Sequence, residues 1–450
     1  MLQKITVILL IFLSFQLFSQ EEKEAKNYGK LSGQWRSFYM LTDNTEDLKD
    51  YNALATGGHL NYKKNFFKGF EIGAALYTTW NLGIQDLTVP DLQTQKTSRY
   101  EEGLFDRLDL EDHSIFILGE LYASYQNDQH FIKLGRMKFN SPLVNGQDGR
   151  MIPSLFQGVH YAFDSNRNTK IQMAAFNFMA PRSTGEFFKI GRSLGTYPIA
   201  RNNDGEGSQY DNNNTDSDFL LIANIDQEIS KNLKLEVWNY FIENVSNSFY
   251  LKPTYQVTDH IDIQGEWLHQ TKINNGGNKL DSLSYFQDNS SDLLGLKIQY
   301  NWFKKNSLSL AYNRILPGGK FLFPREWGRE FIFTFQKRER SEGVSDNHAL
   351  VAYYDQHFKL FNENLAVRSI FSLGKHWNPS VLDPASNKYA MPDYTQVNID
   401  LFFSFKNWKN LKPEILLVQK FGNGDIPDNP NLFFNKVDMF QLNFVLNYNF

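Results

Sequence analysis

Residues that could do chemistry are present in this chain of 450 residues, but their spacing points away from catalysis. The nine histidines are scattered without a close pair, so we expect no metal site. The acidic stretch 204–218 offers oxygen ligands for calcium, but it lacks the spacing of an EF-hand loop and reads better as a solvated extracellular loop. Aspartates and glutamates are plentiful but not clustered. We therefore expect no enzyme activity, no metal and no bound cofactor.

Charged residues interrupt a run of small apolar residues at 131–159, FIKLGRMKFNSPLVNGQDGRMIPSLFQGV. The run reads as a strand that ends near Phe139, an excursion rich in Pro, Gly and Asn, and a return strand that starts near Gln157. The excursion carries Asp148 and Arg150. This mixture fits a loop that packs against an inner wall and leaves a few charges in water. We favour turn and bulge geometry for the glycines of this run.

The elements that would hold such a loop are strands, and the clearest of them is the stretch 440–450, FQLNFVLNYNF. Every second residue from Phe440 is apolar or aromatic, and the residues between them are polar except for Val445. A period of two places these sets on opposite faces of a β-strand, and about ten tilted residues cross a bilayer. The same alternation recurs at 233–241, 261–267, 294–302 and 397–405.

Short and long connections alternate along the chain, as they do between the periplasmic turns and extracellular loops of an outer-membrane barrel. Both termini on the periplasmic side require an even number of strands. Placing the strand-like stretch 330–337 inside the long connection 316–347 gives about eighteen strands. The predicted strands are 31–41, 53–63, 68–80, 114–126, 130–139, 157–164, 169–178, 218–228, 233–243, 248–257, 260–270, 292–302, 307–315, 348–358, 365–373, 394–405, 412–420 and 438–450.

Composition and the N-terminal stretch agree with an exported all-β membrane protein. Residues 1–20 read as a signal peptide, 21–30 as a short charged lead-in and 31–450 as a transmembrane antiparallel β-barrel. Cysteine is absent, which excludes disulfides and thiolate sites. Aromatic residues make up 15% of the chain, and the formal net charge of −4 argues against nucleic acid as a partner. Composition alone also fits a secreted β-sandwich or propeller.

Several motifs resemble the OprD family of outer-membrane porins. The resemblance lies in LGR at 134–136, SPLVN at 141–145, DGRMIP at 148–153 and FQGV at 156–159. The stretches AAFNFMAPRSTGEF at 174–187 and WGRE at 327–330 resemble the family more weakly. The composition, rich in Asn, Lys and Phe, indicates a Bacteroidetes-type member of this family.

The resemblance implies an 18-stranded barrel with short periplasmic turns, long extracellular loops and a third loop, 140–156, folded into the lumen. In the family, arginines on one wall guide solutes that bear carboxylates, and acidic loop residues face them. The positions that match the motifs are Arg136, Arg150 and Arg182. From position alone we add Arg36 and Arg368. The acidic candidates are Asp148 and Glu186. Because Arg136 shares its strand face with Ile132 and Leu134, alternation does not point it cleanly into the lumen.

The resemblance thus predicts a passive channel for small hydrophilic solutes in the cell outer membrane. Expected partners are the outer-membrane lipids and lipopolysaccharide, and the barrel-assembly machinery, which would read the C-terminal Phe450. The sequence leaves monomer and homotrimer open. It also leaves open a plugged or structural barrel (an adhesin or a barrel enzyme) and a polysaccharide export channel.

Overall fold

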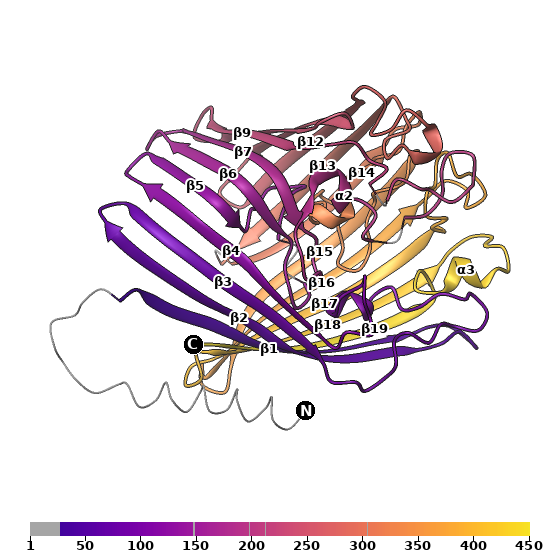
Figure 1. Cartoon of the computed structure of the whole chain (residues 1–450), viewed down its shortest axis with the longest axis horizontal. Coiled ribbons are helices and arrows are strands. Elements are labelled where there is room, and N and C mark those ends of the chain that lie inside the picture. Colours follow the sequence, from indigo (N-terminus) through magenta and orange to yellow (C-terminus); the bar gives the residue numbers. More distant parts are fainter. Residues whose placement is uncertain (1–27, 147–148, 198, 212, 304) are drawn as a thin grey trace.

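The computed structural model describes residues 28–146, 149–197, 199–211, 213–303 and 305–450. The predicted signal peptide and most of the lead-in lie outside the described residues, as does Asp148. The part of the chain that is described is almost entirely β-structure (Figure 1).

Eighteen long strands and one two-residue strand, β8, make up the sheet in the described residues. They are β1 (Lys30–Asp43), β2 (Tyr51–Phe67), β3 (Phe70–Asn81), β4 (Ser114–Gln126), β5 (His130–Met137), β6 (Leu155–Asp164), β7 (Thr169–Ala180), β8 (Phe188–Lys189), β9 (Leu220–Glu228), β10 (Leu233–Ile242), β11 (Ser246–Gln256), β12 (Ile261–Lys272), β13 (Ser290–Trp302), β14 (Asn306–Ile315), β15 (Asn347–Leu360), β16 (Leu365–Trp377), β17 (Tyr394–Phe405), β18 (Leu411–Gly422) and β19 (Met439–Asn449).

Each predicted strand has a counterpart in the structure, with small differences at the ends. The largest are in β2, which runs to Phe67, and β16, which runs to Trp377. The stretch 330–337 lies in a loop, as predicted. The short β8 was not predicted; it pairs only with the end of β7, so it has no alternation of its own to reveal it.

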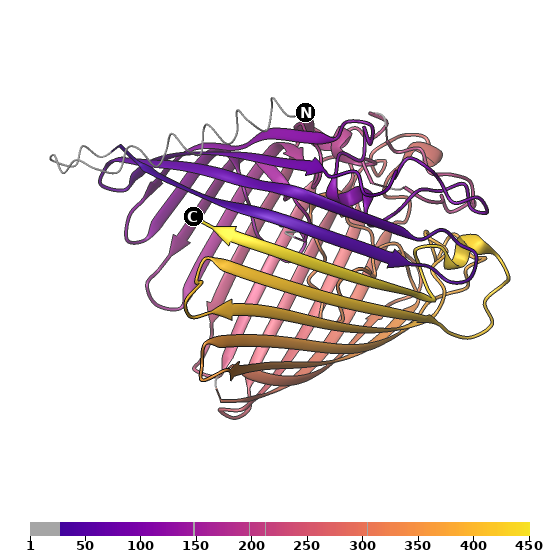
Figure 2. The same ribbon diagram turned by 90° about the horizontal axis from the view of Figure 1, so that it is seen from below.

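The sheet is a closed antiparallel barrel. Each long strand pairs with its neighbour in sequence, with β7 paired directly to β9, and β1 closes the ring by pairing with β19 as well as β2. The all-β barrel of about eighteen strands is therefore confirmed. Short turns gather at one rim and most long loops at the other (Figure 2).

The two faces of each strand meet different surroundings, as the alternation predicts. On β13 the apolar residues Leu294, Leu296, Ile298 and Tyr300 are exposed on the outer face. On β19 the polar set turns inward, where Gln441, Asn443 and Asn447 are buried. A continuous band of outward apolar side chains suits lipid, and buried inward amides need hydrogen-bond partners, so this pattern fits a membrane-spanning barrel whose lumen is partly filled.

Loops fill part of that lumen. The third loop (138–154, between β5 and β6) and the seventh loop (316–346, between β14 and β15) contribute Leu143, Val144 and Trp327 to a buried apolar cluster with Tyr240 of the wall. The second loop (82–113), the fourth loop (181–219) and the ninth loop (423–438) lie at the same rim. The described helices are single turns: η1 (Glu102–Leu104), α2 (Ile190–Ser193), η2 (Asp281–Leu283), η3 (Arg325–Trp327) and α3 (Pro430–Phe433). None of them is long and apolar enough to cross a membrane.

Two glycines on the strands that flank the third loop let β5 lie close to β4 and β6 lie close to β7. Gly135 on β5 and Gly158 on β6 are paired and both have positive φ, 124° and 157°. A Cβ on Gly158 would collide with the carbonyl oxygen of Ala175 on β7. The pairing of β6 with β7 shifts register between Gln157 and Gly158, so a bulge lies at Gly158.

Candidate functional site

The third loop spans the lumen from one wall to the opposite one. Its Leu143 amide donates a hydrogen bond of 3.4 Å to the Tyr240 hydroxyl on β10. Its Arg150 carbonyl oxygen accepts a hydrogen bond from Arg36 Nη1 on β1. In the closed ring β1 and β10 lie nearly across from one another, because seven long strands separate them on one side and nine on the other. The loop therefore crosses the interior.

The seventh loop is hydrogen-bonded to the middle of the third loop. The Asn145 amide donates to the Trp327 carbonyl oxygen at 3.0 Å, and the Asn145 side chain both donates to the Arg329 carbonyl oxygen at 2.8 Å and accepts from the Arg329 amide at 3.0 Å. Ser154 Oγ donates to the Glu326 carbonyl oxygen at 2.9 Å. Paired side-chain and backbone bonds of this kind fix the two loops as one unit.

Beyond that contact the seventh loop follows the inner wall. The Phe333 amide donates to Glu266 on β12 at 2.9 Å, and the Thr334 amide donates to Asn313 on β14 at 2.9 Å. Gln336 Nε2 donates to Ser372 on β16 at 2.9 Å. Backbone amides of this segment donate to polar side chains of the wall. Because these groups already have partners, the strand-like stretch does not pair with a neighbouring strand.

A cavity of about 560 Å³ lies between these loops and the wall. Among the described residues that line it, eleven are Arg or Lys and three are Glu. The basic residues are Lys96, Arg99 and Arg107 of the second loop, Arg150 of the third, Arg182 of the fourth, Arg325, Arg329, Lys337, Arg338 and Arg340 of the seventh, and Lys436 of the ninth. The acidic residues are Glu102, Glu339 and Glu342. Such an excess of fixed positive charge favours anions in a site walled by protein.

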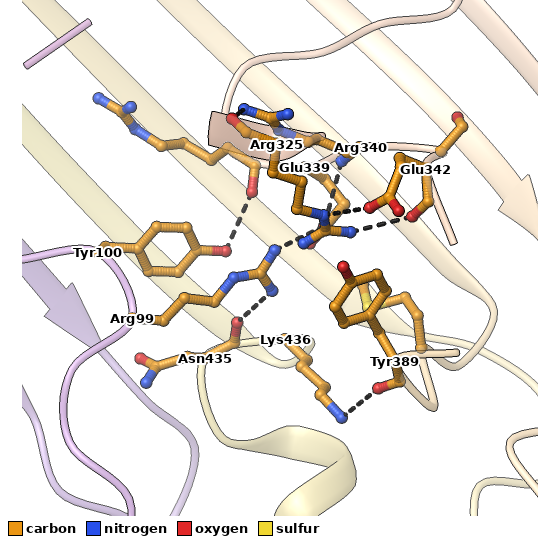
Figure 3. A network of polar contacts seen from close by, with 12 residues as sticks. Arg99, Tyr100, Arg325, Glu339, Arg340, Glu342, Tyr389, Asn435 and Lys436 are labelled. Carbon is orange, nitrogen blue, oxygen red and sulfur yellow. Dashed lines mark hydrogen bonds and ion pairs between the residues drawn. The ribbon is translucent and has the colours of Figure 1, made fainter. Parts of the chain in front are cut away.

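Carboxylates hold one part of this cluster together (Figure 3). Glu339 accepts from Arg99 at 3.0 Å and from Lys420 of β18 at 2.7 Å. Arg325 pairs with Glu342 at 2.5 Å and lies over the Tyr389 ring at 3.7 Å. Buried ion pairs with this many contacts lock the second and seventh loops to the wall.

Other arginines contact neutral groups. Arg182 Nε donates to the Tyr197 hydroxyl at 2.8 Å, Arg338 Nη2 donates to Asn443 of β19 at 2.7 Å, and Arg150 Nη1 donates to the Gly149 carbonyl oxygen at 2.8 Å. The Nε atoms of Arg150 and Arg338 are buried without a hydrogen-bond partner. Among the described residues, neither Arg150 nor Arg338 forms an ion pair with a carboxylate.

The pKa values follow this division. Burial lowers the pKa of Arg338 to about 9, and the nearby Arg329 and Arg182 add to the effect. Burial, Arg338 and Arg182 together lower the pKa of Arg150 well below its usual value. Burial alone would raise the pKa of Glu339, but Arg99 and Lys420 outweigh it and hold that pKa well below the ordinary range. The lowered pKa values of Arg150 and Arg338 reflect repulsion among neighbouring cations. The lowered pKa of Glu339 reflects a carboxylate that stays ionised because two cations pair with it.

Three of the predicted site residues meet in this region. Arg36 bonds to the third loop and, through Nε, to Asn447 of β19 at 2.7 Å. Arg150 and Arg182 line the cavity.

The other predicted residues lie elsewhere. Arg136 shares its outward face with the exposed Ile132 and Leu134, donates to Gln157 and lies over the Phe187 ring at 4.3 Å. Glu186 is exposed near α2. Arg368 on β16 forms a bidentate pair with Asp355 and does not line the cavity.

Most of the basic side chains of the cavity were not predicted. Arg325, Arg329, Arg338 and Arg340 lie within sixteen residues of the seventh loop, and that density is the signal that the sequence offers. Nothing in a local pattern shows that this loop turns inward.

Contrary to the expectation that residue spacing points away from catalysis, one serine in the fourth loop has the G-x-S-x-G spacing of a hydrolase nucleophile, at 191–195. Ser193 is fully buried, donates to the Ile190 carbonyl oxygen at 2.7 Å and accepts from Trp327 Nε1 at 2.8 Å. These contacts place it in the packing of α2 against the seventh loop. In the described ranges no group of three or more His, Asp or Glu is suited to hold a metal ion.

The closed barrel, its loop-filled lumen and its lipid-suited outer face define a transmembrane porin of the outer membrane. The family model described as outer membrane porin, OprD family, matches residues 28–360. The chain belongs to the OprD family.

Solved structures agree with this fold. OccAB4 of Acinetobacter baumannii is 14% identical with a TM-score of 0.68, and the match covers 95% of this chain and 100% of that one. OccAB2 of the same organism is 14% identical with a TM-score of 0.69, covering 95% and 99%. OpdK of Pseudomonas aeruginosa, solved with vanillate, is 12% identical with a TM-score of 0.67, covering 94% and 98%. Comparison with curated proteins gives no match.

Proposed function

We propose that the chain is a passive diffusion channel that prefers small anionic solutes, carboxylate-bearing ones among them, and that its third and seventh loops narrow the pore. The observation that carries the proposal is the cavity between these loops, where basic side chains outnumber acidic ones by eleven to three among the described lining residues. Vanillate, the molecule named with the OpdK structure, is itself a carboxylate.

The physical mechanism needs neither a reaction nor an energy source. Fixed cations between protein walls raise the local concentration of anions and repel cations. Guanidinium groups contact carboxylates through two parallel hydrogen bonds, which orients the solute as it passes. Arg36 holds the third loop in place rather than lining the cavity.

Single-channel recording of the purified protein in a planar bilayer tests the proposal. We expect discrete ohmic steps and, across a KCl gradient, a reversal potential of the sign set by chloride. Steps with the sign set by potassium would refute the anion preference. A folded, heat-modifiable protein that gives no steps would point to a plugged barrel, an adhesin or a barrel enzyme.

Shortening the third loop tests the constriction. Deleting residues 143–152 should raise single-channel conductance, because the deleted segment crosses the lumen. Deleting 279–282, an exposed tip of the sixth loop (273–289), is the matched control and should leave conductance unchanged. Equal conductance of both deletions and the parent chain would show that the third loop does not limit the current.

A further inference from the structure

Four of the short turns carry exposed aromatic side chains. They are Phe67 at the end of β2, Phe303 between β13 and β14, Phe361 between β15 and β16, and Trp408 between β17 and β18. Each of these four residues is between 66% and 88% exposed. Because β1 closes the ring between β19 and β2, the four turns follow one another along a single arc of the rim (Figure 2).

The other four short turns have a different composition. They connect β4 to β5, β6 to β7, β9 to β10 and β11 to β12, at 127–129, 165–168, 229–232 and 257–260. All of their residues are described, and none is Phe, Tyr or Trp; the apolar ones are Ile229 and Val257. Two acidic residues balance two basic ones, namely Asp128 and Asp259 against Arg167 and Lys231. The rim is therefore aromatic on one arc and polar on the opposite arc.

Lysines accompany the aromatic side chains of the first arc. The described residues of its four turns include four lysines, Lys68, Lys305, Lys406 and Lys409. They also include one acidic residue, Glu363, which already pairs with Lys359 of β15 at 3.0 Å. None of the four turn lysines forms an ion pair within the described part of the chain. This arc thus presents positive charge that neighbouring carboxylates leave uncompensated.

The exposed aromatic rings continue the outer face of the wall. Phe67 stacks on Phe70 of β3 with 5.1 Å between the ring centroids, and Trp408 lies 6.0 Å from Phe405 of β17. Asp400 of β17 is buried in the lumen, and alternation places Phe405 on the opposite, outer face. These contacts join the aromatic side chains of the arc to the lipid-facing side of the barrel.

We propose that this aromatic–lysine arc, the four turns with Phe67, Phe303, Phe361 and Trp408, binds the anionic headgroups of phospholipids in the periplasmic leaflet. Outer-membrane barrels place their short turns on the periplasmic side. Aromatic rings and long lysine side chains are the groups that settle at a membrane interface, and lysine is attracted to anionic lipid.

The complementary charge lies on one arc only, so the barrel sits deeper in the membrane on that side. The inference goes beyond the proposed function, because it concerns the outer surface of the barrel and holds whichever solutes pass through the lumen.

Lipid binding by the full-length, folded protein tests the proposal. The protein in detergent micelles is titrated with phosphatidylglycerol or with phosphatidylcholine of the same acyl chains, and bound lipids are counted by native mass spectrometry. We expect half-saturation with phosphatidylglycerol at a concentration about tenfold below that with phosphatidylcholine, because the first headgroup is anionic and the second is neutral overall.

A triple variant removes three lysines from the arc. Lys68→Gln, Lys305→Gln and Lys409→Gln together should raise the half-saturating concentration of phosphatidylglycerol about tenfold and leave that of phosphatidylcholine unchanged. The matched control removes three positive charges on the side of the opposite arc through Arg167→Gln, Lys231→Gln and Lys234→Gln, and it should keep the preference of the parent. Heat-modifiable migration on a gel establishes that each variant is folded.

The depth of the rim in the membrane gives a second measurement. Cysteine is absent from the chain, so a single introduced cysteine can carry a fluorescent label. Phe361→Cys lies on the arc, and Gln129→Cys lies in an exposed turn of the opposite arc. In vesicles of equal parts phosphatidylglycerol and phosphatidylcholine, the uncharged quencher acrylamide should quench the label at position 361 several-fold less than the label at position 129. Both labels lie on the same rim, so the orientation of the barrel affects them equally.

Every outcome supports or overturns the arc as a lipid-binding surface. Equal half-saturation by the two lipids overturns the proposal and leaves the arc as a docking surface for a periplasmic protein. An equal loss of preference in both triple variants assigns the preference to the overall charge of the rim and overturns the proposal as well. Equal quenching at positions 361 and 129 overturns the placement of the arc at the headgroups. A preference lost only with the arc lysines, together with a protected label at position 361, supports the proposal.

Discussion

Arg36 and Arg150 are joined by a hydrogen bond in which the guanidinium group of Arg36 donates to the backbone carbonyl oxygen of Arg150. One arginine thereby positions another, because Arg36 is anchored on the wall through Asn447 and Arg150 lies at the end of the lumen-crossing loop. A charged donor buried against a carbonyl is among the stronger hydrogen bonds available to a loop.

Replacing Arg36 should loosen the third loop without removing it. Arg36→Gln loses an ionic hydrogen bond worth roughly 1.5–3 kcal/mol, so we expect noisier and larger single-channel currents. The control is Arg368→Gln, which removes an arginine whose pairing partner is Asp355 on the neighbouring strand. Currents of Arg36→Gln that match the parent in size and noise would show that the bond does not hold the loop.

Glu339 should be essential for stability. Glu339→Gln leaves the half-buried Arg99 and the fully buried Lys420 without their carboxylate, and we expect the free energy of unfolding to fall by about 3–5 kcal/mol, read as a lower temperature of the heat-modifiable gel shift. The double variant Glu339→Gln with Lys420→Met should recover part of the loss, since one uncompensated charge is then gone. Additive losses in the double variant would contradict the ion-pair explanation.

Glu330 should make stability depend on pH. Burial raises the pKa of Glu330 to about 7, while Arg340 and the Ser341 amide oppose the rise. Because the folded chain holds this proton more tightly than the unfolded chain, the stabilisation is full below about pH 4.5 and is lost as the pH rises to about 7. Glu330→Gln should remove up to about 3 kcal/mol of the change in the free energy of unfolding between pH 5 and 8, which thermal unfolding at each pH measures. Glu363→Gln, in an exposed turn, should keep the dependence of the parent.

Lys436 should make anion preference depend on pH. Burial, with Lys96 and Arg99 nearby, lowers the pKa of Lys436 to about 7. Acidification from pH 8 to 6 therefore adds a positive charge to the cavity, and the reversal potential should shift further toward the chloride value. In Lys436→Met that shift should shrink, because the side chain stays neutral at both pH values. An undiminished shift would assign it to other groups.

Alternation in the sequence predicts the wall because each strand must satisfy lipid on one face and the lumen on the other. That constraint is local, so β4 and β17 have the predicted ends. Alternation left the direction of Arg136 open, and the structure places Arg136 on the outer face with the exposed Ile132 and Leu134.

The interior was less predictable because its contacts join distant parts of the chain. Asn145 meets Arg329 across 184 residues, and Arg338 meets Asn443 across 105. No periodicity marks such pairs. The family resemblance predicted Arg150 and Arg182 as site residues. The arginines of the seventh loop belong to no motif that would indicate their position in the lumen.

The apolar side chains of the third and seventh loops pack with wall residues in one buried cluster, as the interior of a water-soluble protein does. Loop and wall should consequently melt in a single transition. A barrel with such a packed interior depends less on bilayer thickness and lipid composition for its shape than an empty cylinder does, and it should keep that shape after transfer into detergent micelles.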